Sequence, residues 1–173
     1  MQEVGIGRDI LAVGAGVGLS EHARWQPKWT IEKYNSEMKL YDVEQIEGNL
    51  LLNEGISSLL TLLIGGSETP FNNTNAYIGV GDGTTEAASN QTGLLGENKS
   101  YAPMDATFPQ VSGNTVTFRS TFGPTAGNHA WREFTVSNGN SDTAKNLNRK
   151  VETAQRFKVE PDTWVIQLQV TLS

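Results

Sequence analysis

Apolar residues recur at every second position near the end of this 173-residue chain, and no other feature constrains the fold as much. The apolar positions are Trp164, Ile166, Leu168, Val170 and Leu172, and Gln167, Gln169 and Thr171 separate the last four. A period of two places the two sets on opposite faces of a β-strand. A shift of one residue in register would expose the whole apolar set, so the register of this strand is well defined.

Three shorter segments upstream carry related signals. Residues 76–80 form a short apolar run, and residues 115–122 alternate with three apolar side chains on one face. In residues 130–136, the apolar residues are Phe134 and Val136 on one face and Trp131 on the other. Eighteen glycines and a hydrophobic share of only 37% suit a protein rich in turns. Short strands separated by polar turns predict a mainly β protein, an antiparallel sandwich or barrel.

Residues 49–64 predict the single helix. Leucine and isoleucine recur there at spacings of three and four, at Leu52, Ile56, Leu59, Leu60 and Leu63. Asn49 or Asn53 can cap its start, and Gly65-Gly66 ends it. Further apolar residues widen the apolar face, so we expect neighbours to cover the helix on most sides. It is predicted to be a core helix or an interface helix.

Residues 1–48 have few alternating patterns and predict an extended N-terminal arm with one or two short strands, ahead of a helix and β domain at 49–173. Pro27 restricts Gln26 to extended conformations, which argues against a helix there. The candidate interface with a partner comprises Trp25, Pro27, Lys28, Trp29, Tyr34 and Tyr41. The two tryptophans either pack onto their own β domain or anchor on another subunit, where such rings concentrate binding energy.

Charge and cysteine content exclude several classes of function. The net charge of −6 and the lack of a basic run argue against nucleic acid as a partner. The absence of cysteine excludes disulfides and thiolate zinc sites. The apolar stretch Ile10–Leu19 is too short to span a bilayer, and Glu3 and Asp9 cancel the positive charge that a signal peptide carries ahead of it. We therefore expect no membrane partner.

The motifs that suggest a cofactor are incomplete. The glycines of residues 14–18 lack the third glycine of a dinucleotide loop, because Leu19 stands in its place. Gly81-Asp82-Gly83 is interpreted as a tight turn. Asp82 could bind calcium together with Asn72, Asn73, Asn75 or Glu86, but the spacing of these residues does not match an EF-hand loop. We predict no cofactor and no metal.

No catalytic arrangement stands out either. His22 and His129 belong to no metal-binding pair, and we expect His129 at the start of a strand. Two pairs of carboxylates could serve as the catalytic pair of a glycosidase: Glu133 with Glu152, and Asp105 with Asp162. Carboxylates on the strands of an acidic protein usually form solvated faces, so we predict that the chain is not an enzyme.

Several segments together resemble a family of tailed-bacteriophage virion proteins, similar to capsid cement (decoration) proteins. They are residues 75–85, 91–94, 114–122, 128–133, 147–150 and 163–164, and the resemblance runs over roughly residues 22–173. It implies a β domain on the outer surface of the virion that bridges major capsid subunits, often as a homotrimer. It carries over no functional residues, because the family has no catalytic motif.

The function expected from this resemblance is a non-enzymatic protein that binds the outside of the assembled capsid and stabilises the shell. Such a protein would be made in the cytoplasm of the bacterial host. A structural protein of the phage tail or fibre base is the first alternative. A module that binds carbohydrate or another host-surface ligand is the second, and its candidate aromatic residues are Tyr77, Tyr101 and Trp131. Burial of Trp131 would argue strongly against that second alternative.

Overall fold

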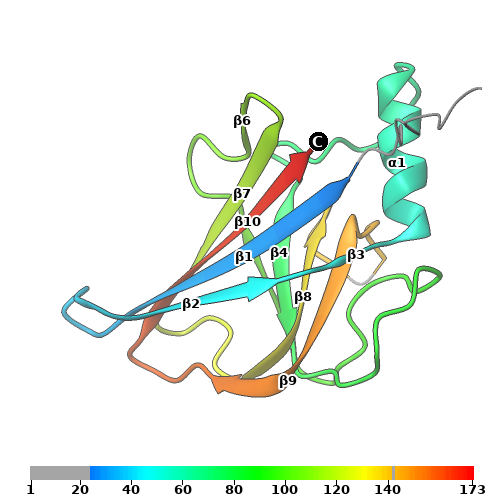
Figure 1. The fold of residues 1–173 in the computed structure, drawn as a ribbon. Coiled ribbons are helices and arrows are strands. Elements are labelled where there is room, and N and C mark those ends of the chain that lie inside the picture. Colours follow the sequence, from blue (N-terminus) through cyan, green and yellow to red (C-terminus); the bar gives the residue numbers. More distant parts are fainter. Residues whose placement is uncertain (1–23, 142) are drawn as a thin grey trace, which may run out of the picture.

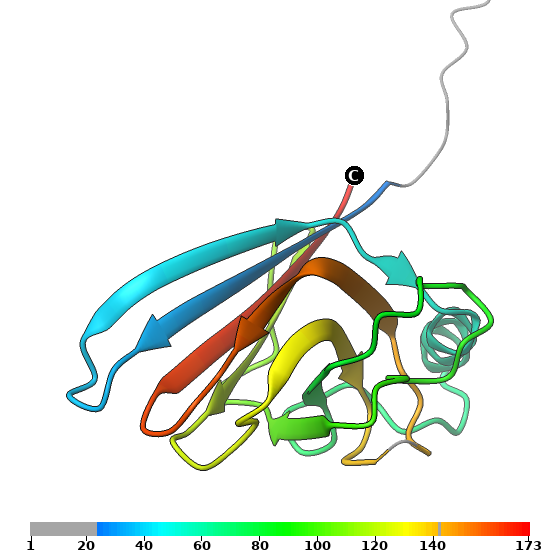
Figure 2. The same ribbon diagram turned by 90° about the horizontal axis from the view of Figure 1, so that it is seen from below.

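The computed structural model describes residues 24–141 and 143–173. In them, two five-stranded antiparallel sheets pack face to face, with one helix beside an end of the sandwich (Figures 1 and 2). The first sheet contains, in chain order, β1 (Trp25–Tyr34), β2 (Leu40–Glu47), β6 (Gln110–Ser112), β7 (Thr115–Phe122) and β10 (Thr163–Leu172). The second contains β3 (Leu50–Leu51), β4 (Tyr77–Gly81), β5 (Lys99–Pro103), β8 (Ala130–Ser137) and β9 (Asn148–Phe157). The helix is α1 (Asn53–Leu63).

The order of strands is β2-β1-β10-β7-β6 in one sheet and β3-β9-β8-β4-β5 in the other. The predicted β10 strand is therefore the central strand of the first sheet. Its residues Ile166 and Leu168 are fully buried, and the core between the sheets is rich in aromatic rings. The Trp131 ring lies edge-on to both Phe122 and Trp164, with centroid distances of 4.8 and 4.9 Å. This arrangement confirms the predicted antiparallel sandwich.

The one or two strands predicted within residues 1–48 agree with β1 and β2, but these strands are long and belong to the first sheet, so residues 25–47 are part of the sandwich. β1 pairs with β10 along its whole length, from Trp25 opposite Leu172 to Tyr34 opposite Thr163. Pro27 does not interrupt this strand, because the pairing of β1 with β2 begins only at Lys28. The missing N–H of the proline thus falls where one side of β1 has no neighbouring strand. The rest of the predicted arm, residues 1–23, lies outside the described residues.

The single helix is confirmed, but its start and its covered face differ from the prediction. Leu50 and Leu51 pair with β9, and Leu52 precedes the helix without a side-chain cap, so neither Asn49 nor Asn53 caps it. The buried residues of α1 are the small Gly55 and Ser58. The apolar residues Ile56, Leu59, Leu60, Leu63 and Ile64 are instead 39 to 83% exposed. The expectation that neighbours cover the helix on most sides is therefore wrong.

A close approach of backbone explains this orientation of α1. A Cβ added at Gly55 would lie 2.3 Å from the carbonyl oxygen of Leu147. Only glycine allows the helix to approach the segment before β9 so closely. Small residues therefore face the sandwich and the bulky ones point outward. The end of the helix agrees with the prediction, since Gly65 has a φ of 72° and its N–H donates to Leu62 O.

The pairing of β8 with β9 is irregular beside the core. Trp131 pairs with Arg156 but Glu133 pairs with Val151, so a single residue of β8 stands opposite four residues of β9. The simple alternation along β8 breaks at this irregularity, and Trp131 lies in the same core cluster as Phe134 and Val136. The prediction that Trp131 lies on the opposite face is therefore wrong, and Trp131 is fully buried.

Candidate functional site

The residues predicted to contact a partner do not form one surface. Trp29 is fully buried, and its ring centroid lies 5.7 Å from that of Phe134, so in this fold it belongs to the core. Trp25 is partly buried beside α1. Pro27 and Lys28 are partly buried and line a shallow surface region with Glu47. Of the two alternatives for the tryptophans, the structure supports packing onto their own domain.

The two predicted tyrosines lie near the turn between β1 and β2. The Tyr34 hydroxyl donates to Glu32 Oε2 over 2.8 Å, and the Tyr41 hydroxyl donates to Asp162 Oδ2 over 2.6 Å. Tyr41 remains 52% exposed. Of the six predicted interface residues, Tyr41 is therefore the one with a large exposed side chain at a protruding part of the fold.

The structure reveals two exposed apolar surfaces. One lies on the helix that the sequence predicts as a core or interface helix, and the other includes the predicted interface residue Tyr41. The helix patch consists of Ile56, Leu60, Leu63 and Ile64. The hairpin patch consists of Met38, Leu40, Tyr41 and Val43, at the turn between β1 and β2 and on β2 itself. The two patches lie at opposite ends of the molecule, since the β1–β2 hairpin projects away from α1 in both views (Figures 1 and 2).

Charged groups join the two strands of the hairpin close to its turn, where Lys33 pairs with Asp42. Lys33 Nζ donates to Asp42 over 2.8 Å and to Glu44, and it lies 4.8 Å from the ring centroid of Trp164. Arg156 Nε donates to Glu44 Oε2 over 2.6 Å. Burial raises the pKa of Glu44, but the hydrogen bonds from Lys33 and Arg156 outweigh it and keep that pKa below its usual value. These interactions stiffen the strands that carry the hairpin patch.

An apolar groove of about 500 Å³ lies between α1 and the first sheet. Its lining is Trp25, Leu59, Leu62, Phe71, Val111, Gly113, Asn114, Thr115, Val116, Phe118, Leu147, Val170 and Leu172. The innermost side chains are buried core residues, whereas Val111 and Leu172 at its margin are 76% and 49% exposed. The groove therefore opens the apolar interior to the surface beside the helix patch.

Glu133, weighed above as a catalytic carboxylate, lies in a buried ion pair. Its side chain and that of Arg149 are fully buried, and Arg149 Nη2 donates to Glu133 Oε2 over 2.6 Å. Oε1 accepts hydrogen bonds from the backbone N–H groups of Gly83 and Gly96, over 3.2 and 2.7 Å. Leu95 N–H is also within hydrogen-bond distance of both oxygens. This arrangement fixes the loop between β4 and β5 and leaves the carboxylate no open side for a substrate.

The other carboxylates weighed as catalytic residues also have separate partners. Glu152 bonds to Lys150 at 2.9 Å. Asp105 accepts from the Thr121 hydroxyl over 3.0 Å, and Asp162 accepts from Tyr41 as described above. The arrangement does not bring either predicted pair together as a free acid and base.

The residues weighed as calcium ligands are likewise used within the fold. The Asp82 carboxylate accepts hydrogen bonds from the backbone and the side chain of Asn98, over 3.1 and 2.6 Å. Asn72 Oδ1 accepts from the N–H groups that follow it, and Asn73 Nδ2 donates to the carbonyl oxygens of Asp105 and Phe108. Within residues 24–141 and 143–173, no group of three or more His, Asp or Glu side chains could hold a metal ion.

His129 lies directly before β8, as expected, and contacts a serine of β5. Its Nε2 lies 3.0 Å from the Ser100 hydroxyl, and its Nδ1 lies 2.9 Å from the Ala130 carbonyl oxygen. A carbonyl oxygen can only accept, so the contact with Ala130 needs a proton on Nδ1. An activated serine needs a base that a third group orients. The group that orients His129 is the backbone carbonyl of Ala130. The contact between Ser100 and His129 joins β5 to the start of β8. His22 lies outside the described residues.

Comparisons of the chain with protein-family models, with curated proteins and with solved structures find no match. In the described part of the chain, no helix has the length and apolar content needed to cross a bilayer. The main apolar features on the surface of the described residues are the helix patch, the hairpin patch and the apolar groove.

Proposed function

We propose that this chain is a non-enzymatic structural protein of a tailed phage, which binds the outside of the assembled capsid and bridges neighbouring major capsid subunits. One observation carries the proposal: a single sandwich exposes two apolar patches at opposite ends (Figure 1). A protein that joins two subunits needs two separate contact surfaces on one stiff body. The resemblance to cement proteins noted in the sequence supplies the phage particle as the setting.

The exposed side chains supply enough energy for such contacts. Leu63 and Ile64 are 80% and 83% exposed in the helix patch, and Met38 is 59% exposed in the hairpin patch. Full burial of one aliphatic side chain of this size contributes about 1.5–3 kcal/mol. A few such contacts, repeated over a symmetric shell, stabilise the assembled state because the protein binds only that state.

The charge of the chain fits the same role. A net charge of −6 keeps free copies apart in the bacterial cytoplasm, where the protein would be made. Association then depends on the apolar patches meeting complementary surfaces. Within the proposal, three copies form a homotrimer on the outer surface of the virion, and the major capsid protein is the other partner.

The first test is the number of copies in each purified particle, measured by quantitative mass spectrometry against the major capsid protein. A copy number in a simple ratio to the capsid protein, in the hundreds, is expected for a cement protein. A few copies, or a small multiple of three or six, would overturn the capsid proposal in favour of the tail or fibre base. Absence from purified particles would overturn both.

The carbohydrate-binding alternative is weakened by one observation. Trp131 is fully buried and its indole N–H donates to Gly127 O over 2.8 Å, so it cannot stack on a sugar. The other two aromatic candidates, Tyr77 and Tyr101, are partly buried. The structural role is therefore preferred to a sugar-binding role.

A further inference from the structure

We infer that the apolar segment Ile10–Leu19 of the same chain occupies the groove between α1 and the first sheet. This inference does not depend on the proposed capsid role. It concerns how the free protein covers an apolar surface that the described residues leave open. The groove, the place where β1 begins and the sequence before it each support this occupant.

The groove selects an apolar occupant. Leu59 and Leu62 of α1 line one wall, and Trp25 and Val116 of the first sheet line the other. Phe118, Leu147 and Val170 lie at its base and are at most 3% exposed. A volume of about 500 Å³ lies in the range of pockets that enclose a ligand. An uncovered apolar surface of this kind usually marks a binding site.

The start of β1 brings the preceding residues to the groove. Trp25 is both the first residue of β1 and part of the groove wall. Paired hydrogen bonds between Arg24 and Ser173, of 2.7 and 3.2 Å, hold the chain there against the end of β10. Trp25 and Leu172 of β10 line the groove together with Leu59 and Leu62 of α1. Residues 20–24 separate Leu19 from Trp25, and five extended residues span at most roughly 18 Å, which is enough to return to the groove.

The segment itself has the composition that the groove requires. Residues 10–19 read ILAVGAGVGL and contain no charged or polar side chain. Five of these ten residues are glycine or alanine, so the backbone can approach the walls of a narrow groove closely. Charged residues flank the segment, with Asp9 before it and Glu21 after it. Both flanks can therefore stay in water while the segment is buried.

Binding within one chain is favoured over binding to a second copy. A short connection gives the segment an effective concentration in the millimolar range at its own groove. Free copies of the protein, each with a net charge of −6, repel one another at low salt. The segment is therefore assigned to the groove of its own chain.

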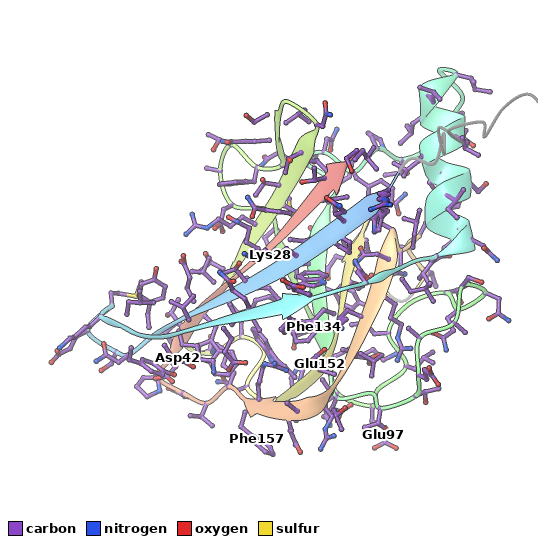
Figure 3. The ribbon with its side chains drawn as sticks, in the orientation of Figure 1. Lys28, Asp42, Glu97, Phe134, Glu152 and Phe157 are labelled. Atoms are coloured by element: carbon purple, nitrogen blue, oxygen red, sulfur yellow. The ribbon has the colours of Figure 1, made fainter. Side chains whose placement is uncertain are left out.

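The absence of cysteine allows a direct test in the full chain. Ala15→Cys is combined with Val111→Cys at the margin of the groove, and the pair is treated with a short bismaleimide. The matched control combines Ala15→Cys with Glu97→Cys, because Glu97 is also exposed but lies far from α1 (Figure 3). Links are identified by peptide mass spectrometry, and the mass of the linked chain shows whether one copy or two took part.

The expected result is a link within one chain that forms at least about tenfold faster for the Val111 pair than for the Glu97 pair. Adding Val13→Asp, which puts a charge inside the segment, should reduce the rate for the Val111 pair to that of the control. Equal rates for the two pairs, a link at the mass of two chains, or no effect of Val13→Asp would overturn the inference. The experiment contains no capsid, so its outcome is separate from the test of capsid binding.

Discussion

Arg149 Nη2 lies 2.6 Å from Glu133 Oε2, and neither side chain is exposed to solvent. Arg149 Nη1 also donates to the Thr85 carbonyl oxygen and to the Gln91 side chain, over 2.9 and 2.8 Å. One ion pair thus joins β8 and β9 to a long loop that has no regular structure. Burying two charges is unfavourable unless every hydrogen-bonding group is satisfied, which the loop accomplishes here.

Glu133→Leu should lower the free energy of unfolding by about 3–5 kcal/mol, because it leaves a buried arginine without its partner. Urea unfolding measures this loss. Arg149→Met alone should have a similar effect, and the double variant should lose clearly less than the sum, since no charge remains buried. Glu152→Gln, at a partly exposed pair, is the control and should change stability by less than about 1 kcal/mol. Additive losses in the double variant would contradict this account.

Trp29→Ala should destabilise the protein by about 3–5 kcal/mol, because the ring is fully buried in the core. Trp25→Ala should have a smaller effect, since Trp25 is only partly buried. Trp29→Phe should be tolerated better than Trp29→Ala, because the buried Trp29 Nε1 has no hydrogen-bond partner to lose. The relative loss of stability of the three variants is measured by thermal unfolding, monitored by circular dichroism. A larger loss for Trp25→Ala would mean that Trp29 does not belong to the core.

Acid should loosen the β1–β2 hairpin near its turn. The pKa of Glu44 is held below its usual value by hydrogen bonds from Lys33 and Arg156, which outweigh the effect of burial. A carboxylate with a lowered pKa stabilises the fold above its unfolded-state pKa, and this contribution is lost as the pH falls through the folded pKa.

The urea midpoint should therefore fall more steeply between about pH 5 and pH 3 in the natural chain than in Glu44→Gln. Glu97→Gln, which changes an exposed carboxylate in the loop before β5, serves as the control and should keep the profile of the natural chain. Identical profiles for Glu44→Gln and the natural chain would show that this carboxylate does not contribute.

Leu63→Lys should leave the stability of the free protein within about 0.5 kcal/mol, because the side chain is 80% exposed. In the proposed function it should nevertheless weaken binding to purified shells, measured by co-sedimentation. Thr84→Lys adds the same charge at an exposed position outside the helix patch, in the loop after β4, and serves as the matched control. Equal shell binding by the two variants would remove the helix patch from the contact surface.

Gly55→Ala should destabilise the protein by about 1–3 kcal/mol, although alanine favours helices. The added Cβ would lie 2.3 Å from Leu147 O, and backbone cannot move aside as a flexible side chain can. Ser57→Ala, at an exposed position of α1, should be close to neutral in the same urea experiment. If Gly55→Ala left the free energy of unfolding unchanged, the packing of α1 would not depend on this close approach.

The local pattern was sufficient for the elements that have one dominant periodicity. β10 and β7 alternate over eight to ten residues, and the structure pairs them directly. The spacing of leucines and isoleucines predicted α1, and Gly65 marked its end. In each case the signal lies within a few neighbouring residues, because a side chain's direction along a strand or helix repeats with a fixed period.

Local patterns of residues were enough to predict the strong strands, the helix and the antiparallel β class. Contacts in the folded protein place Trp29 and Trp131 in the core, with Trp131 beside an irregularity in the β8–β9 pairing, and turn the bulky face of α1 outward. They also bring Glu133 to Arg149. The physical reason is that these outcomes depend on contacts between distant segments, such as Trp29 with Phe134 and Gly55 with Leu147, which local periodicity does not encode.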